Sequence, residues 1–139
     1  MKRALVGMLA FAVLLAGCGE KPKPKANAIV SQSTSPGSPF KTKLEIQPEQ
    51  PIDGKPETFT LTVTDTSGKP VAGAKVAGEL VMPIMDMGKN TFAMNEQSAG
   101  VYRGTGTTTM QGEWEVQFHI IAAGLSGTHG YHVVFEPSE

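Results

Sequence analysis

EWEVQFHI, residues 113–120, alternates a polar with an apolar side chain at every step. The apolar members are Trp114, Val116, Phe118 and Ile120. Successive side chains of a β-strand point to opposite faces, so this period of two predicts a strand with one buried and one solvated face. No window of the chain shows a sustained helical period. The stretch therefore indicates an all-β protein.

The same alternation recurs on both sides of this stretch, and residues typical of turns (Gly, Asp, Asn and Pro) separate the repeats. We expect seven strands, near residues 42–47, 57–65, 72–82, 91–96, 100–108, 113–122 and 130–136. Seven short strands at this spacing predict an Ig-like antiparallel β-sandwich. Another small antiparallel barrel is the alternative.

The amino-terminal residues 1–17 predict an export signal. The basic pair Lys2-Arg3 precedes a nearly continuous apolar run, residues 4–16, which is shorter than the ~20 residues that span a bilayer. The run ends in Leu15-Ala16-Gly17-Cys18, which resembles the bacterial lipobox. That resemblance implies cleavage before Cys18, a thioether-linked diacylglycerol on its sulfur, and acylation of the new amino terminus. An ordinary signal peptide with a chance cysteine is the alternative.

We expect residues 18–39 to be the lipidated cysteine with a flexible linker, and residues 40–139 to be the sandwich. Within the linker only Ile29 and Val30 are aliphatic, too little to bury and so to order the segment. As a random coil it would hold the domain on the order of 25 Å from the membrane. The run Lys-Pro-Lys-Pro-Lys, residues 21–25, favours a solvated spacer, with attraction to anionic headgroups as the alternative.

Composition argues against two classes of function. From Leu44 onward the chain has five basic and twelve acidic residues, a net charge of −7, whereas nucleic-acid binding needs a basic face. Lipidation uses the only cysteine, and the sequence has no nucleophile elbow, no phosphate-binding glycine loop and no paired carboxylates in an apolar setting. We therefore expect a monomer that is not an enzyme and does not bind nucleic acid.

Five methionines follow the signal peptide, and strand phase divides them into two groups. They are Met82, Met85, Met87, Met94 and Met110. Met82 continues an inward-facing series that ends in Leu80, and Met94 shares a face with Phe92, so both are expected in the core, where methionine fills irregular gaps. Pro83 cannot sit in a central ladder and should end its strand. Met85 and Met87 then lie in a connection, where packing does not require them.

Consecutive strands of a sandwich reverse direction, so alternate connections gather at one end. This places Met85 and Met87 at the same end as Met110, which precedes the turn at Gln111-Gly112. Thioether sulfur is soft and uncharged, so it suits Cu(I) and hardly binds hard cations. The sequence thus predicts a modest Cu(I) site of Met85, Met87 and Met110, to which Met82 and Met94 are possible additions.

The three histidines are not expected to join this site. His129 is predicted at the opposite end of the sandwich, and His119 lies mid-strand on the polar face. His129 and His132 are three residues apart and should point to opposite faces of one strand. A zinc site is accordingly not expected.

The residues together resemble a known family. The stretch DTSGKPVAGAKV, residues 65–76, is followed by Met82-Pro83, Met85 and Met87, and then by Gly100-Val101-Tyr102 and Met110-Gln111-Gly112-Glu113-Trp114. This order is similar to that of YtkA-like domains, which are related to FixH-like domains, over about residues 43–135. The resemblance implies an exported Ig-like sandwich associated with copper or other heavy-metal handling, or with cytochrome oxidase assembly.

The resemblance also implies roles for individual residues. Met82, Met85, Met87 and Met110 match methionine-rich positions of the family, and Trp114, Tyr102 and Gly112 match structural ones. A methionine-plus-histidine copper site is not evident in this chain.

Two functions follow as hypotheses for a protein held to the bilayer by acylated Cys18. In the first, the domain binds Cu(I) or a similar soft metal and exchanges it with an envelope protein of metal efflux or oxidase assembly. In the second, it is a non-catalytic interaction module whose methionine-rich end is an adaptable contact surface. Gly19 is not the acidic residue that typically retains lipoproteins in the inner membrane. Where a cell has two membranes, we expect the outer one, facing the periplasm.

Overall fold

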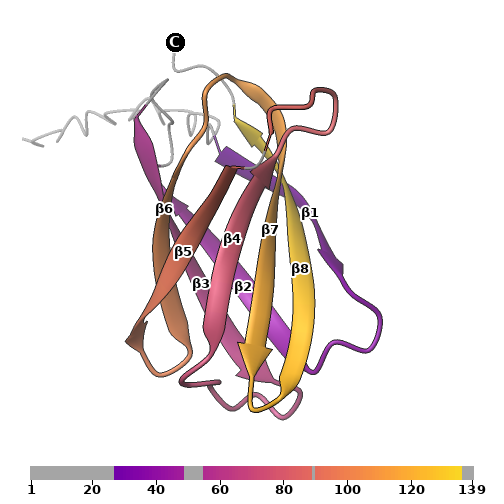
Figure 1. Ribbon diagram of the computed structural model, residues 1–139, viewed down its shortest axis with the longest axis vertical. Helices are drawn as coiled ribbons and strands as arrows, with labels where there is room; N and C mark the ends of the chain where they lie inside the picture. The colour runs from indigo at the N-terminus through magenta and orange to yellow at the C-terminus, as the bar shows by residue number, and fades with distance from the viewer. Residues whose placement is uncertain (1–26, 49–54, 89, 136–139) are drawn as a thin grey trace, which may run out of the picture.

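The computed structural model describes residues 27–48, 55–88 and 90–135, and every regular element in these ranges is a β-strand (Figure 1). The strands are β1 (Asn27–Thr34), β2 (Phe40–Gln47), β3 (Pro56–Asp65), β4 (Lys75–Val81), β5 (Asn90–Ser98), β6 (Val101–Thr107), β7 (Gly112–Ala122) and β8 (Leu125–Phe135). The expected signal peptide and Cys18 lie outside the described residues.

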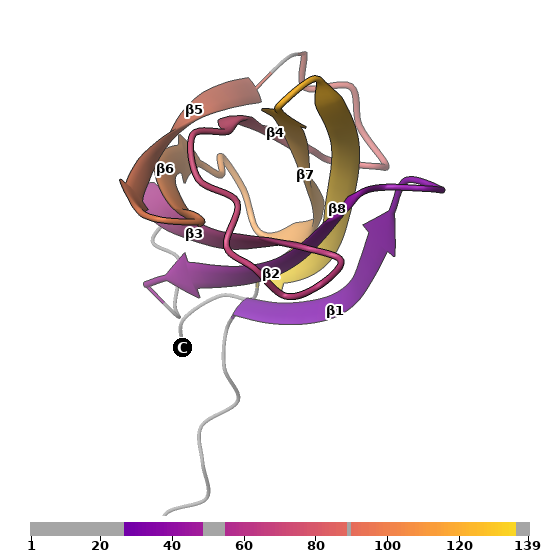
Figure 2. The same ribbon diagram turned by 90° about the horizontal axis from the view of Figure 1, so that it is seen from below.

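All neighbouring strands are antiparallel, in the order β1-β8-β7-β4-β5-β6-β3-β2. The sheet curls into two layers because β5 changes partner along its length: Asn90–Met94 pairs with β4, and Asn95–Ser98 pairs with β6. Viewed along the strands, the layers enclose one interior (Figure 2). The predicted all-β sandwich is confirmed.

The alternating residues that predicted β7 are those that fill the core. Trp114, Val116, Phe118 and Ile120 are all fully buried. Aromatic rings continue across the interior, with centroid distances of 5.0 Å for Phe59 to Phe92, 6.3 Å for Phe92 to Phe118 and 6.0 Å for Phe118 to Tyr131. Burial of these side chains supplies the main favourable term in folding.

Strand β1 corrects the expected domain boundary. Residues 27–34 were assigned to the flexible linker, yet they pair along β8, from Asn27 opposite Phe135 to Thr34 opposite His129. Polar side chains strengthen this attachment: Gln32 Nε2 donates to Thr42 Oγ1 at 3.0 Å, and Thr34 Oγ1 lies 3.3 Å from His129 Nδ1. Residues from Asn27 onward therefore belong to the sheet, and the described residues form eight strands where seven were expected.

The start of β8 is a second correction. We expected this strand from about residue 130, because the glycines of residues 124–130 resemble a loop. Instead β7 and β8 pair through to Ala122 opposite Leu125, and the turn consists of Ala123 and Gly124, both with positive φ. The strand near residues 72–82 is likewise shorter than expected and begins at Lys75.

Candidate functional site

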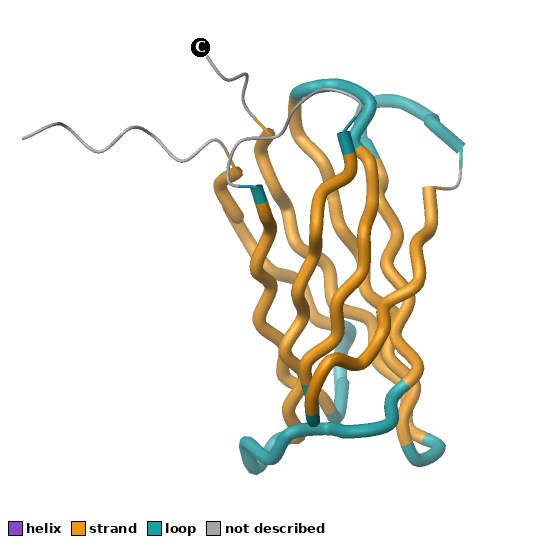
Figure 3. Tube along the Cα trace, turned by 90° about the vertical axis from the view of Figure 1, so that its left-hand side faces the viewer, coloured by secondary structure: helices purple, strands orange, loops and turns teal. Residues whose placement is uncertain are grey.

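Two connections meet at one end of the sandwich. Leu80 of β4 lies opposite Asn90 of β5, and the Asn90 side chain donates 3.1 Å to the carbonyl oxygen of Thr107 at the end of β6. Val81 lies opposite Glu115, near the start of β7. The β4–β5 and β6–β7 connections therefore share this end, as the sequence predicted (Figure 3). We call residues 82–88 and 108–111 the methionine pole.

The conformation of the β4–β5 connection follows from its sequence. Pro83 ends the ladder of β4, as predicted, and starts a turn in which the Met85 N–H donates 3.1 Å to the carbonyl of Met82. The Asp86 carboxylate then accepts a bond of 3.0 Å from the Gly88 N–H, and Gly88 has a φ of 72°. These turns place Met85 and Met87 outside the core.

The β6–β7 connection is held by Trp114 and Gly112, two residues that we predicted to be structural. The buried Trp114 donates from Nε1 to the carbonyl oxygen of Met110 at 3.1 Å. Gly112 has a φ of 132°, and a Cβ atom there would lie 3.5 Å from the Met82 Cε. The buried Met82 methyl group thus lies close to the first residue of β7, directly after the second connection.

Exposure separates the methionines as the strand phase predicted. Met82 and Met94 are only 3% and 7% exposed, whereas Met85, Met87 and Met110 are 48%, 38% and 38% exposed. Ile84, in the same pole, is 79% exposed. The pole thus presents three accessible thioethers and one aliphatic side chain, whose chemistry allows either soft-metal binding or an apolar contact.

A buried carboxylic acid lies at the same end and was not predicted. Glu57 follows the inward phase of Phe59 and Leu61 on β3 and is 1% exposed. It accepts a bond of 2.9 Å from Thr108 Oγ1, and its Oε2 has no partner among the described residues. Burial raises the pKa of Glu57, and the Thr108 bond opposes that rise. The sequence signal that could have predicted its burial is the alternation of β3, which places Glu57 on the same face as Phe59 and Leu61.

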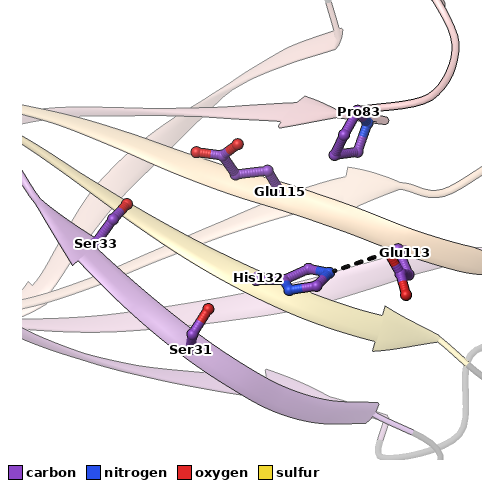
Figure 4. Close-up of a pocket in the computed structure, with 6 residues that line it drawn as sticks. All are labelled: Ser31, Ser33, Pro83, Glu113, Glu115 and His132. Carbon is purple, nitrogen blue, oxygen red and sulfur yellow. Dashed lines mark ion pairs between the residues drawn. The ribbon is translucent and has the colours of Figure 1, made fainter.

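A shallow groove runs along the outer face of β1, β8 and β7 toward Pro83 (Figure 4). His132 Nε2 points to Glu113 Oε2 at 3.6 Å, whereas the carboxylate of Glu115 accepts a bond of 3.0 Å from Gln117. Within residues 27–48, 55–88 and 90–135, no three His, Cys, Asp or Glu side chains gather as metal ligands.

His129 was predicted at the end opposite the methionine pole, at the start of its strand. Because β8 begins at Leu125, His129 instead lies in mid-strand opposite Phe118, where it is buried and contacts Thr34 and Ser38. His132 faces outward, as expected from its spacing. His119 is exposed on the outer face of β7. Tyr102, the remaining structural prediction, is fully buried and donates 2.6 Å to the Val71 carbonyl, which fixes the β3–β4 connection.

In the parts of the chain that the structure describes, no helix is long and apolar enough to cross a membrane. A family model described as YtkA-like matches residues 35–119, more than half of the chain. The match includes both connections of the methionine pole. No curated protein matches the sequence significantly.

Proposed function

The chain belongs to the YtkA-like family, and from that premise we propose that it is a membrane-anchored extracytoplasmic lipoprotein that binds Cu(I) or a similar soft metal. Met85, Met87 and Met110 would hold the ion. One observation carries the proposal: three partly exposed thioethers lie on two connections that share one end of the sandwich.

The donor set fits a soft ion. Thioethers carry no charge and no proton at neutral pH, so Cu(I) binding requires no deprotonation, and hard cations gain little from them. The turns at Pro83 and Gly88 and the Trp114 bond to Met110 restrain both connections without burying the sulfurs. Partial exposure favours exchange of the ion with a second protein, in metal efflux or oxidase assembly, over permanent storage.

Acylation of Cys18 would hold the protein at the bilayer, in the outer membrane where the cell has two. We propose no catalytic role, and the domain would act as a monomer. Mass spectrometry of the membrane-extracted protein tests the anchor. Loss of residues 1–17 with diacylglycerol on Cys18 supports it, and an unmodified thiol contradicts it.

The metal proposal is tested by titrating Cu(I) into the mature Cys18→Ser chain against a competing chelator. This variant carries no lipid, and it lacks the only thiol of the chain, which would compete with the methionines for Cu(I). The triple variant Met85→Ile, Met87→Ile, Met110→Ile removes the sulfurs but keeps apolar volume. We expect it to lose copper while its thermal midpoint stays close to that of its parent; unchanged copper retention would refute the site.

The alternative function is a non-catalytic interaction module, and Ile84 favours it, because the most exposed apolar side chain of the pole has no ligand chemistry. Exposed apolar side chains that cluster often mark contact surfaces. Two results together would favour this function over metal binding. The parent chain would fail to bind copper, and Ile84→Ser would lose the capture of a partner protein that the parent shows.

A further inference from the structure

The amino-terminal strand enters the domain at the methionine pole. Asn27, the first residue of β1, lies opposite Phe135, and Phe135 lies opposite Gly112 at the start of β7. Figure 1 shows β1 running away from this end. Because β1 is paired along its length, the part of the chain that joins Cys18 to the domain is residues 19–26, and not the longer linker that ends at Pro39.

This short connection limits how the domain can face the membrane. From Cys18 to Asn27 are nine steps along the chain, which reach about 28 Å in the polyproline conformation and about 32 Å at full extension. Strand β7 has eleven residues, so the sandwich is about 33 Å long at ~3.3 Å per residue. With the anchor in the bilayer and β1 paired, contact of the opposite end with the surface would require an almost fully extended connection, so the methionine pole is held nearer the membrane.

The outer face of β7 is a poor candidate for membrane contact because of its charge. The outer face of β7 presents Glu113, Glu115, Gln117 and His119, and carboxylates are repelled by anionic headgroups. The methionine pole instead exposes Ile84, Met85, Met87 and Met110. Lys55 is exposed beside it at the start of β3, and Lys21, Lys23 and Lys25 precede β1 in the sequence.

We propose that the methionine pole rests on the lipid headgroup layer of the membrane that carries Cys18. This orientation depends on the acylation in the proposed function but not on copper. The four exposed apolar side chains contact the interface to a shallow depth, since the pole also carries the exposed carboxylate of Asp86. A metal held there would face the bilayer, within reach of membrane-embedded proteins and not of soluble ones.

The test uses the lipidated mature protein in vesicles of three parts phosphatidylethanolamine to one part phosphatidylglycerol. Since Cys18 is consumed by its thioether, a cysteine introduced elsewhere is the only reactive thiol. A thiol-reactive fluorophore attached to Ile84→Cys reports on the methionine pole. The same fluorophore attached to Leu125→Cys, at a position that is also exposed and apolar, reports on the opposite end. We expect headgroup-attached quenchers to reduce the fluorescence of the first label and to leave the second nearly unchanged.

Equal quenching at both sites, or stronger quenching at residue 125, would overturn the orientation. If the fluorophore at residue 84 is quenched only after a membrane-protein extract is added, the pole contacts a protein partner, and the lipid contact is refuted. A second pair, Met85→Cys and Ile121→Cys, repeats the comparison if either first variant folds poorly. Mature protein without diacylglycerol on Cys18 would also overturn the proposal. Failure of the Cu(I) titration, by contrast, would refute only the metal site.

Discussion

The indole Nε1 of Trp114 donates a hydrogen bond of 3.1 Å to the main-chain carbonyl of Met110, four residues earlier in the chain. Trp114 is fully buried, whereas the Met110 side chain is 38% exposed. One bond therefore connects the core to the accessible connection between β6 and β7. It restrains the backbone that carries one of the three proposed sulfur ligands.

Trp114→Phe should lower the free energy of unfolding by about 1–3 kcal/mol, because it removes this bond and part of a core side chain. Urea denaturation measures the loss. We also expect weaker Cu(I) retention, since Met110 becomes less restrained. Tyr131→Phe is the matched control: it removes the bond of 2.7 Å to Thr42, which lies on β2 and not at the methionine pole. Equal copper affinity in Trp114→Phe and its parent would show that this bond does not organise the site.

Division of the sulfurs between the two connections gives a second prediction. If the site spans both, Met85→Ile with Met87→Ile, and Met110→Ile alone, should each weaken Cu(I) binding markedly in a chelator competition. Buried Met94 serves as the comparison, because Met94→Ile removes a sulfur that is only 7% exposed and should leave copper binding unchanged. A Met110→Ile variant with full affinity would confine the site to the β4–β5 connection.

His129 predicts that the domain loses stability in mild acid. Burial lowers the pKa of His129 below its ordinary value of 6.5. Between the folded pKa and 6.5 the unfolded chain binds more protons than the native chain. The stability that neutral His129 contributes is therefore complete above about pH 6.5 and is lost as the pH falls through the folded pKa. Urea midpoints from pH 8 to pH 5 should show this decline. His129→Gln should reduce the slope, and an unchanged slope would exclude His129 as its source.

The buried Glu57 makes the stability of the domain depend on pH in the opposite direction. Burial raises the pKa of Glu57 above 4.5, so between 4.5 and the folded pKa the native chain binds more protons. The contribution is complete below 4.5 and is lost as the pH rises through the folded pKa. Glu57→Gln should therefore raise the urea midpoint at pH 8 relative to its parent, and the gain should vanish near pH 4. Thr58→Ala, on the other face of β3, is the control. A larger gain at pH 4 than at pH 8 would contradict the assignment.

Gly104 predicts a strong steric requirement within β6. A Cβ atom there would lie 2.5 Å from the Ala93 carbonyl oxygen and 2.5 Å from the Met94 sulfur. Since the carbonyl belongs to the backbone of β5, the strand itself must shift. We expect Gly104→Ala to destabilise the domain by about 1–3 kcal/mol, typical of overpacking. Thr105→Ala, at an exposed position of the same strand, should change stability little in the same thermal or urea assay.

The strands that face both the core and the solvent could be predicted because their alternation is local. EWEVQFHI gave the buried phase of β7 correctly, and Pro83 marked the end of β4. The reversal of successive strands then placed the connections that carry Met85 and Met110 at one end. Each inference needs only side-chain periodicity and the missing N–H of proline.

The errors arose where a partner distant in the sequence decides the structure. Residues 27–34 contain few apolar side chains, so their sequence resembles a linker, yet the free edge of β8 binds them as β1. The glycines between residues 124 and 130 resemble a loop but allow close approach: a Cβ atom at Gly130 would lie 2.6 Å from Ser33 Oγ of β1.

By itself, the sequence determined the strand phase, the residues of the core and the end of the sandwich at which the exposed methionines lie. Only the tertiary structure decided that β1 belongs to the sheet and that it starts at the methionine pole. It also decided that Glu57 is buried with one oxygen that has no partner among the described residues. The physical reason is that strand pairing depends on backbone hydrogen bonds, which every residue except proline can donate and accept. A pattern of side chains therefore predicts burial well, but it does not specify which distant strand will satisfy an open edge.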